Sequence, residues 1–288
     1  MRYSFIAENA EHWPVSLMCV LLEVSASGYY ESKTPRLNGR CGDGEGIVVE
    51  IRAIHAEVKQ CYGSPRMHAE LKSRGYSCSL NRVAKLMKNA GISASVPRRF
   101  VRTTDSGHGL PVAENVLDRQ FDRATGPDQL WTADITYVPT KEGWLYLAAV
   151  EDLFSRRIVG WAMAATLESR LVVDALTMAI EGRRPGAGLL SHSDRGSQYA
   201  SEHYRTLLAK RGIRCSMSRK ADCWDNAPME SFFASLKKER CHRADYWTRQ
   251  EAERDIFEYI EVFYNRKRRH SSPGYVSPEE YEKVNKSS

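Results

Sequence analysis

Apolar residues in the first part of the chain recur at helical spacing. The runs over residues 15–22 and 24–30 predict two short helices within a small helical unit that occupies residues 1–35. Residues 32–46 are rich in Gly, Ser, Asn and Pro, so we expect a linker there.

A longer amphipathic pattern begins at Ile47. Apolar residues recur at i, i+4, i+7 and i+11, which places Ile47, Ile51, Ile54 and Val58 on one helix face. Pro65 suits the first turn of a second helix, because its fixed backbone angle matches the helix and its missing N–H is not needed there.

Glycine and serine mark the ends of the next elements. Gly75 is expected to end the second helix, Ser79 to cap a third, and Gly91 to end that one. Three short helices with a glycine-containing turn before a basic last helix are typical of a helix-turn-helix. An ordinary helical bundle with a polar exterior is the alternative.

The pattern changes to α/β after an irregular stretch in which we expect one short helix, near residues 116–121. Runs of strand character then alternate with helical patterns. The expected strands are residues 130–138, 144–151, 157–163, 188–193 and 213–218, and the expected helices are 168–182, 201–211, 226–241 and 248–265. Three strands in succession followed by strands alternating with helices predict an α/β fold with a mixed sheet flanked by helices.

These patterns divide the chain into four segments. Residues 1–46 form the N-terminal helical segment and linker, and residues 47–103 the basic helix-turn-helix-like module. Residues 104–126 are a connector, and residues 127–288 form the α/β core with a C-terminal helix and basic tail. The 42% of hydrophobic residues in 288 is ample for a core in each compact unit.

Positive charge is concentrated in the helical module. The net charge is +6, but residues 63–102 alone contain nine Lys or Arg and one acid, Glu70. Basic charge in one module is typical of a protein that binds a polyanion such as DNA. The predicted phosphate contacts are Arg66, Arg82, Lys85, Lys88, Arg98 and Arg99, with Arg266, Arg268 and Arg269 as secondary candidates.

Other features of the composition limit the class of protein. The seven cysteines form no C-x-x-C pair and follow no secretory signal, so we expect reduced thiols and a cytoplasmic protein. Apolar runs are shorter than the roughly 20 residues needed to cross a bilayer.

Three carboxylates occupy positions that suit metal chemistry. Asp134 interrupts a strand-like run, Asp194 follows an apolar run at the expected end of a strand, and Glu230 begins a helical pattern. An ionised acid in a mostly buried strand is costly unless it is paired or binds metal. Converging carboxylates form an all-oxygen cage for Mg²⁺, and two such ions can drive phosphodiester cleavage or transfer.

Each carboxylate alone also fits an ordinary role. Asp134 fits a buried hydrogen-bonded side chain, Asp194 a helix cap, and Glu230 an exposed helical residue. Among neighbouring acids, Asp152 lies between two expected strands and is interpreted as a turn residue. Asp225 precedes a helix and is interpreted as its cap.

Polar neighbours of these acids extend the candidate site. Lys237 lies two turns after Glu230 on the same helix face, so one face can offer both a metal ligand and a phosphate contact. Arg195 and Gln198 follow Asp194 and offer a cation and a hydrogen-bonding amide for phosphate. Trp131 is interpreted as a core residue.

Several spaced motifs occur in one order along nearly the whole chain. They are the segment from Phe5 to Tyr30, Tyr62-Gly-Ser-Pro-Arg-Met-His-Ala-Glu-Leu71, Thr104-Asp-Ser-Gly-His108, Leu130-Trp-Thr-Ala-Asp-Ile-Thr-Tyr137, Asp152-Leu-Phe-Ser-Arg-Arg-Ile-Val-Gly-Trp161, His192-Ser-Asp-Arg-Gly-Ser-Gln-Tyr199, Asp225-Asn-Ala-Pro-Met-Glu-Ser-Phe-Phe233 and Tyr264-Asn-Arg-Lys-Arg-Arg-His-Ser271. Together they resemble the OrfB transposases of the bacterial insertion-sequence-3 type, which have a retroviral-integrase-like core. The chain departs from the pattern at Pro273, where members usually carry an apolar residue such as leucine.

The resemblance implies an RNase H-like core with Asp134, Asp194 and Glu230 as catalytic acids around two Mg²⁺ or Mn²⁺ ions, and Lys237 as the basic residue after the glutamate. It also implies that water frees a 3′-hydroxyl at the element end, and that this hydroxyl attacks a second phosphodiester. The family's active form is usually a fusion with an upstream OrfA protein that carries helix-turn-helix and zipper segments. This sequence has no zipper heptads, so we expect an OrfA fusion or partner and a homo-oligomer on DNA.

We therefore predict a bacterial insertion-sequence transposase that cleaves and transfers DNA strands at element ends. A sequence-independent metal nuclease on the same core and a non-catalytic DNA-binding regulator are the alternatives.

Overall fold

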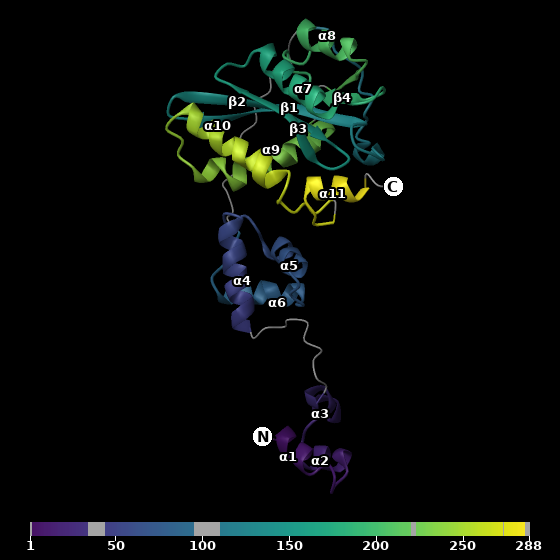
Figure 1. Ribbon diagram of the computed structural model, residues 1–288, viewed down its shortest axis with the longest axis vertical. Helices are drawn as coiled ribbons and strands as arrows, with labels where there is room; N and C mark the ends of the chain where they lie inside the picture. Colours follow the sequence, from purple (N-terminus) through teal and green to yellow (C-terminus); the bar gives the residue numbers. More distant parts are fainter. Residues whose placement is uncertain (1, 34–43, 95–109, 220–222, 273, 286–288) are drawn as a thin grey trace.

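The structure is a computed structural model that describes residues 2–33, 44–94, 110–219, 223–272 and 274–285. Figure 1 shows two helical units followed along the chain by an α/β core. Within the described ranges, no helix is long and apolar enough to cross a membrane.

The first helical unit contains α1 (Arg2–Glu8), α2 (Val15–Leu21) and α3 (Ala26–Lys33). It has a small apolar core of its own, formed by Ile6, Met18, Cys19 and Tyr29. The predicted N-terminal helices are confirmed. The expected linker is too long at both ends, because α3 continues to Lys33 and the next helix begins at Gly44.

The second helical unit contains α4 (Gly44–Glu57), α5 (Ser64–Ser73) and α6 (Leu80–Asn89). The α4 residues predicted to form its apolar stripe are buried. Pro65 lies in the first turn of α5, and the Ser79 side chain accepts a hydrogen bond from the backbone N–H of the third α6 residue. The predicted three-helix order is therefore confirmed.

Five strands form the sheet of the α/β core in the described part of the chain. They are β1 (Leu130–Thr140), β2 (Gly143–Asp152), β3 (Arg157–Ala164), β4 (Leu190–Ser193) and β5 (Arg214–Met217). The order across the sheet is β3-β2-β1-β4-β5. Strands β1, β2 and β3 pair antiparallel, whereas β4 pairs parallel with both β1 and β5. The predicted mixed sheet is confirmed.

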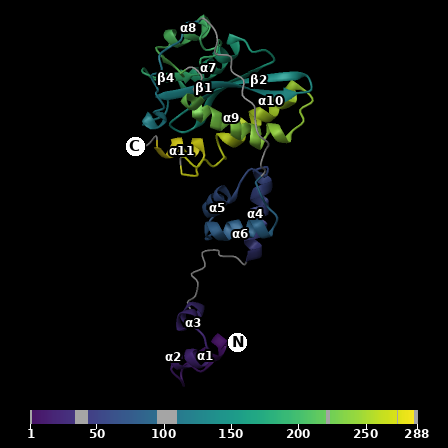
Figure 2. The ribbon, with the colours of Figure 1, turned by 180° about the vertical axis from the view of Figure 1, so that it is seen from behind.

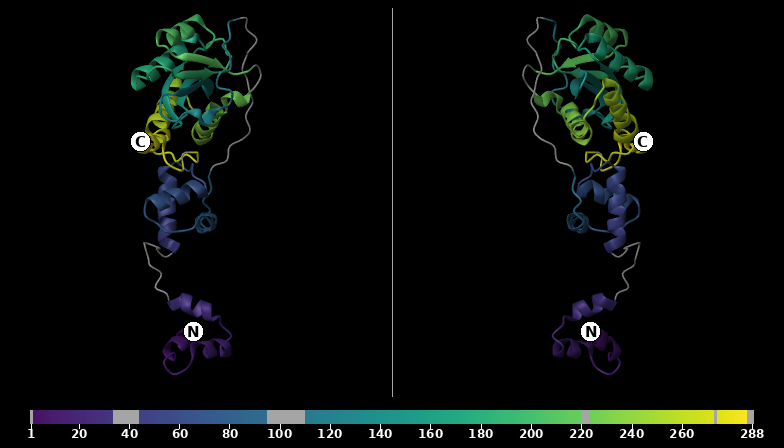
Figure 3. Two further views of the ribbon diagram at one scale, coloured as in Figure 1. Left: turned by 90° about the vertical axis from the view of Figure 1, so that its right-hand side faces the viewer. Right: turned by 90° about the vertical axis from the view of Figure 1, so that its left-hand side faces the viewer.

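Helices cover both faces of this sheet. The helical elements are α7 (Ser169–Arg183), α8 (Glu202–Lys210), the 3-10 turn η2 (Cys223–Asn226), α9 (Ala227–Glu239), the 3-10 turn η3 (Cys241–Arg243), α10 (Arg249–Phe257), the π-helix η4 (Glu258–Tyr264) and α11 (Pro278–Asn285). Helices α7 and α8 pack on one face and α9 and α10 on the other (Figures 2 and 3). The short helix expected near residues 116–121 is instead a single 3-10 turn, η1 (Phe121–Arg123).

The second helical unit packs against the core through the α9 side of the sheet. Apolar residues of α4, α5 and α6 share one buried cluster with α9, α10 and η4. The Tyr62 hydroxyl donates to the carbonyl of Lys267 at 3.2 Å and accepts the backbone N–H of Arg269 at 3.0 Å. The Arg269 side chain donates to Glu70 at 2.6 Å. The helical unit and the core are therefore joined by both apolar and polar contacts.

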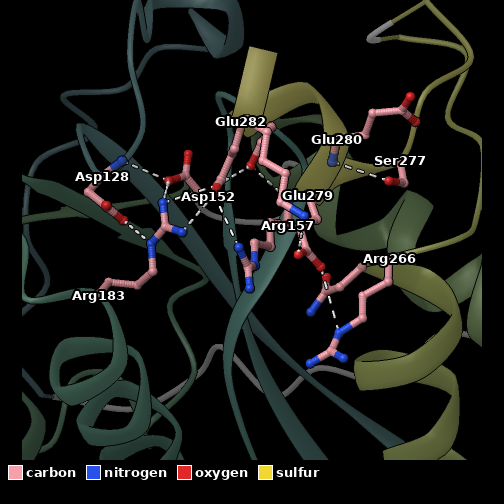
Figure 4. Close-up of polar contacts among 12 residues, drawn as sticks. Asp128, Asp152, Arg157, Arg183, Arg266, Ser277, Glu279, Glu280 and Glu282 are labelled. Carbon is pink, nitrogen blue, oxygen red and sulfur yellow. Dashed lines mark hydrogen bonds and ion pairs between the residues drawn. The ribbon is translucent and has the colours of Figure 1, made fainter. Parts of the chain in front are cut away.

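Buried ion pairs fix the C-terminal helix to the core (Figure 4). Glu282 on α11 is 2% exposed and accepts hydrogen bonds from Arg183 at 2.8 and 3.0 Å. It also accepts from Ser155 at 2.8 Å and from Arg157 at 3.2 Å. Arg183 in turn contacts Asp128 at 2.7 Å. The last helix is thereby held to α7 and to the turn between β2 and β3.

Asp152 also belongs to this network (Figure 4). It is the last residue of β2, and one oxygen accepts the backbone N–H of Phe154 at 2.9 Å, which confirms the predicted turn role. The other oxygen accepts the backbone N–H of Asp128 at 2.7 Å. Burial raises the pKa of Asp152 to about 7. The side chain therefore binds two separate segments.

Glu282→Gln is expected to lower the free energy of unfolding by on the order of 3 kcal/mol, because it leaves the Arg183 charge without its main partner. Urea unfolding at neutral pH measures the effect. Glu280→Gln, at an exposed position of the same helix, is the matched control. Equal urea midpoints for the two variants would contradict the assignment.

The effect of Glu282→Gln is also expected to depend on pH. Burial opposes ionisation of Glu282, but the hydrogen bonds and charge of Arg183 outweigh burial and lower its pKa. The stabilisation is therefore fully present above about pH 4.3, the unfolded pKa of a glutamate. It is lost as pH falls through the lower folded pKa. The difference between wild type and variant should shrink in acid.

Candidate active site

Parallel pairing of β1 with β4 brings two of the predicted acids together. Ala133 on β1 pairs with Ser193 on β4, and Asp134 and Asp194 are the next residues along the two segments. Both acidic side chains are partly buried. The register of a single strand pair therefore places one carboxylate beside the other where β4 ends.

Backbone amides orient the two aspartates. One oxygen of Asp134 accepts the N–H of Ile135 at 2.8 Å, and one oxygen of Asp194 accepts the N–H of Gly196 at 2.8 Å. A Cβ at position 196 would lie 3.0 Å from that Asp194 oxygen. Glycine at position 196 therefore lets the loop backbone approach the carboxylate.

The surroundings of Asp134 make its negative charge unfavourable in the absence of a cation. Burial raises the pKa of Asp134 well above its usual value, and the charges of Asp194 and Glu230 raise it further. The Ile135 N–H and the Lys237 charge act in the opposite direction. All three predicted acids are therefore close enough to interact, and a bound divalent cation would relieve their repulsion.

Glu230 does not close a cage with the aspartates. It lies in the first turn of α9 and is exposed to solvent. Among the residues that the structure describes, no three His, Cys, Asp or Glu side chains are arranged to hold one metal ion. The three-carboxylate cage therefore stays a prediction, with the third acid on a separate helix and exposed to solvent.

Asn226 fixes the start of α9 against β1. Its side-chain oxygen accepts a hydrogen bond from the Thr132 hydroxyl, and its amide nitrogen donates to the carbonyl of Ala133 at 3.3 Å. The residue is buried. Asn226 thus relates the helix that carries Glu230 to the strand that carries Asp134. The sequence reading missed this role, although the Asp-Asn pair directly before the helix was an available signal.

Asp225 is not the helix cap that the sequence predicted. It is buried and accepts hydrogen bonds from Arg219 at 2.8, 2.9 and 3.1 Å, from Arg119 at 2.8 Å and from Asn115 at 2.9 Å. Burial opposes its charge, but the hydrogen bonds from Arg219 outweigh burial and hold the pKa of Asp225 far below its usual value. Asp225 therefore ties the connector and the segment after β5 to the start of α9.

Lys237 lies inside the protein, whereas the sequence suggested a phosphate contact. It is 8% exposed, and its ammonium group lies 4.8 Å from the centre of the Tyr137 ring. Burial lowers the pKa of Lys237 to about 8, and the charge of Asp134 opposes that shift. In this structure Lys237 supplies positive charge to Asp134, and its predicted contact with DNA stays a prediction.

A buried histidine supports the strand that ends at Asp194. His192 on β4 contacts the hydroxyls of Ser216 at 2.8 Å and Ser218 at 3.2 Å. Burial lowers its pKa to about 4, so the ring is neutral at physiological pH. This contact joins β4 to β5 beneath the candidate site, and the sequence reading did not anticipate it.

Two predicted phosphate contacts follow Asp194 in a partly exposed loop. Arg195 donates to the carbonyl of Ser218, and Gln198 donates to the carbonyl of Leu167 at 3.3 Å. These hydrogen bonds hold the loop against neighbouring segments, and both side chains remain partly accessible beside the candidate site.

The predicted basic residues of the helical unit differ in accessibility. Lys85 and Lys88 on α6 are exposed, and Arg82 is partly buried. Arg66 is partly buried and lies 3.6 Å from Glu239. The predictions at positions 98 and 99 lie outside the described residues.

The basic residues of the C-terminal segment largely form ion pairs with acids of the protein itself. Arg266 is exposed and lies 3.6 Å from Glu279. Arg268 is 3% exposed and binds Glu239 at 2.7 Å, and Arg269 binds Glu70 at 2.6 Å. Arg268 and Arg269 are therefore each held by an internal carboxylate, and their predicted phosphate contacts stay predictions.

Three protein families match successive parts of the chain. Residues 43–100 match the HTH-like domain, and residues 124–223 and 230–285 match two families that are both described as integrase core domain. The first match contains α4, α5 and α6, and the other two contain Asp134, Asp194 and Glu230. Among solved structures, a simian T-cell lymphotropic virus intasome covers 81% of this chain and 74% of its own at 14% identity, with a TM-score of 0.48.

Curated relatives align along most of the chain. The insertion element IS600 uncharacterized 31 kDa protein of Shigella sonnei is 44% identical over 261 residues, which are 91% of this chain and 96% of the relative. Transposase InsF for insertion sequence IS3A of Escherichia coli is 40% identical over 287 residues, which are 99% of each chain. With this identity over the full length, the chain belongs to the family of IS3-type insertion-sequence transposases.

Proposed function

We propose that this transposase cleaves and transfers DNA strands at the ends of its insertion sequence by divalent-metal chemistry, with Asp134, Asp194 and Glu230 as the catalytic acids. The observation that carries the proposal is the β1–β4 register, which sets the two aspartates beside each other. Glu230 adds to the same local negative charge from α9. All three acids lie within the segments that match an integrase core.

The proposal assigns two Mg²⁺ or Mn²⁺ ions to these residues, whose oxygen donors suit such hard cations. Asp134 and Asp194 offer paired carboxylates in a partly buried position, which suits a hard cation that prefers oxygen ligands. Glu230 offers a third carboxylate from an exposed position on α9, where it remains accessible to an approaching metal and DNA. When bound, such ions activate the attacking oxygen and stabilise the leaving oxygen of the phosphodiester.

The protein's own residues supply the geometry for this chemistry. Backbone amides hold one oxygen of each aspartate and so set the direction of its carboxylate. Asn226 fixes the start of α9 relative to β1, which limits where Glu230 can move. Lys237 places a positive charge beside Asp134 from the same helix. The acids are thus oriented by hydrogen bonds and charge from neighbouring residues of the protein itself.

The second helical unit favours DNA as the partner of this protein. The HTH-like match covers α6, which exposes Lys85 and Lys88, and we propose these two residues as phosphate contacts together with Arg82. Arg195 and Gln198 are proposed contacts nearer the acids. An OrfA fusion or partner and assembly into a homo-oligomer on DNA also remain proposals.

Asp194→Asn is expected to lower strand transfer by more than about 100-fold, since even residues that only support a metal ligand contribute about 10–100-fold. Labelled element-end DNA, incubated with Mg²⁺ or Mn²⁺ and with or without an OrfA fusion, measures cleavage and joining separately. Asp174→Asn, an exposed residue of α7, is the matched control. Unchanged strand transfer in Asp194→Asn would refute the assignment. Cleavage without joining by the wild type would instead indicate a nuclease.

Asn226→Ala is expected to reduce strand transfer by about 10–100-fold while the protein still folds. The change removes the hydrogen bonds to Thr132 and Ala133, which costs about 1–3 kcal/mol of stability and loosens α9. A role in positioning Glu230 predicts that a higher Mg²⁺ concentration is needed for half-maximal activity. Loss of stability with an unchanged Mg²⁺ requirement would show that Asn226 has a purely structural role.

A further inference from the structure

A cavity of about 300 Å³ lies beside α9, between the second helical unit and the core. Its polar lining includes Arg66 from α5, Ser231 and Ser235 from α9, Arg156 from the turn between β2 and β3, and Arg268 and His270 from the segment after η4. The volume is about ten times the 30 Å³ that a water molecule occupies in the liquid. The cavity is thus roomy enough for a phosphate group with its waters.

Positive charge is concentrated around this cavity. Burial lowers the pKa of His270 well below its usual value, and the charges of Arg268, Arg66 and Arg156 lower it further. All three guanidinium groups therefore act on one neutral ring. Glu239 binds Arg268 at 2.7 Å and lies 3.6 Å from Arg66, so one carboxylate is shared between two cations. The arginines exceed the acidic groups that neutralise them.

Arg156 lines the cavity from the tight turn between β2 and β3. Its φ of 64° lies in the left-handed region, which costs a residue with a side chain roughly 1–2 kcal/mol. Its guanidinium lies 3.5 Å from Glu151, which also lines the cavity. The second oxygen of Glu151 is buried and has no hydrogen-bond partner among the described residues. The cavity wall therefore contains a strained arginine beside a carboxyl group, and burial raises the pKa of Glu151 to about 7, which weakens its repulsion of an anion.

We propose that this cavity binds a backbone phosphate of the DNA on which the enzyme acts, with Arg66 and Arg156 as its cationic ligands and the Ser231 hydroxyl as a further donor. Guanidinium groups suit this task because their paired N–H groups match two phosphate oxygens. This inference rests on the proposed function, because it takes the ligand to be the DNA that reaches the catalytic acids.

The position of the cavity favours DNA over a free anion. Ser231 directly follows Glu230 along α9, so the cavity and the proposed active site share one helix. Its opposite wall is Arg66 on α5, within the HTH-like match. Duplex DNA carries one negative charge about every 1.7 Å along its axis, so DNA held by both parts presents phosphates between them. A phosphate bound here would connect the helical unit with the catalytic acids.

The salt dependence of DNA binding tests the proposal. Fluorescence anisotropy of the full chain with labelled element-end duplex, in EDTA and over a series of salt concentrations, gives the affinity and its slope against salt. Arg66→Gln and Arg156→Gln should each weaken binding several-fold and reduce that slope, and the two changes together should reduce it by about 0.9, the contribution of one phosphate contact. Arg156→Lys should restore most of the slope. Arg170→Gln, which changes an 86% exposed arginine on α7, should leave both quantities unchanged.

A neutral methylphosphonate placed at single positions of the duplex locates the contact. At one position of the duplex, the methylphosphonate should weaken DNA binding by the wild type. At that same position it should not further weaken DNA binding by Arg156→Gln. Unchanged slopes in both arginine variants, with circular dichroism spectra like that of the wild type, would overturn the proposal. Arg156→Gln deprives Glu151 of its partner. If that variant does not fold, the salt slope of Arg66→Gln decides the test.

Inorganic phosphate tests whether the cavity binds a free anion and not a phosphate of DNA. If phosphate raises the melting temperature of the wild type but not of Arg156→Gln, and the DNA slopes do not change, the cavity binds a free anion and the DNA assignment is overturned. Failure here is separable from failure of the proposed function. If the salt slopes of the arginine variants do not change and Asp194→Asn is inactive in strand transfer, only the cavity proposal is rejected. If Asp194→Asn is active, the proposed metal chemistry is rejected.

Discussion

Strand β1 carries a carboxylate in the middle of the sheet, and its parallel pairing with β4 sets a second carboxylate beside it. Mutual repulsion of the two charges destabilises this arrangement, so the rest of the sheet must hold the register. β1 is paired on both sides, and Trp131 and Ala133 are buried in the cluster beneath α7 and α8. A slip of one residue would move Asp134 to the opposite face of the sheet and expose these apolar side chains. The same packing therefore maintains both the fold and the acidic pair.

The position of Glu230, the third acid, depends on α9, and this helix is fixed at both ends. Asn226 bonds the start of α9 to β1, and Glu239 near its end accepts hydrogen bonds from Arg268 at 2.7 and 2.8 Å and from Tyr259 at 2.9 Å. Glu239 also lies 3.6 Å from Arg66 of the helical unit. Movement of the helical unit on DNA would therefore act on the helix that carries Glu230.

Local pattern predicted most of the elements but not their long-range contacts. The strands and helices of the core follow from apolar periodicity, and the end of β4 correctly located Asp194. Asp225 looked like a cap because it precedes a helix, yet its partners lie as far as 110 residues away along the chain. Asn226 was missed for the same reason, since its hydrogen bonds reach a strand more than 90 residues earlier. Such partners depend on how the chain folds back on itself, which local spacing does not encode.

The same limit applies to charge. Sequence counts treat every arginine as available to phosphate, but Arg74 binds Glu50, Glu57 and Glu70 at 2.7–2.9 Å, and Arg268 is enclosed with Glu239. An arginine that is already neutralised inside the protein releases no counterion from DNA when the complex forms. The number of basic residues is therefore an upper bound on the number of phosphate contacts. The electrostatic part of DNA binding must come from side chains that the fold leaves accessible, such as Lys85 and Lys88 on α6, and from groups of arginines that outnumber their acidic partners, such as those around the cavity beside α9.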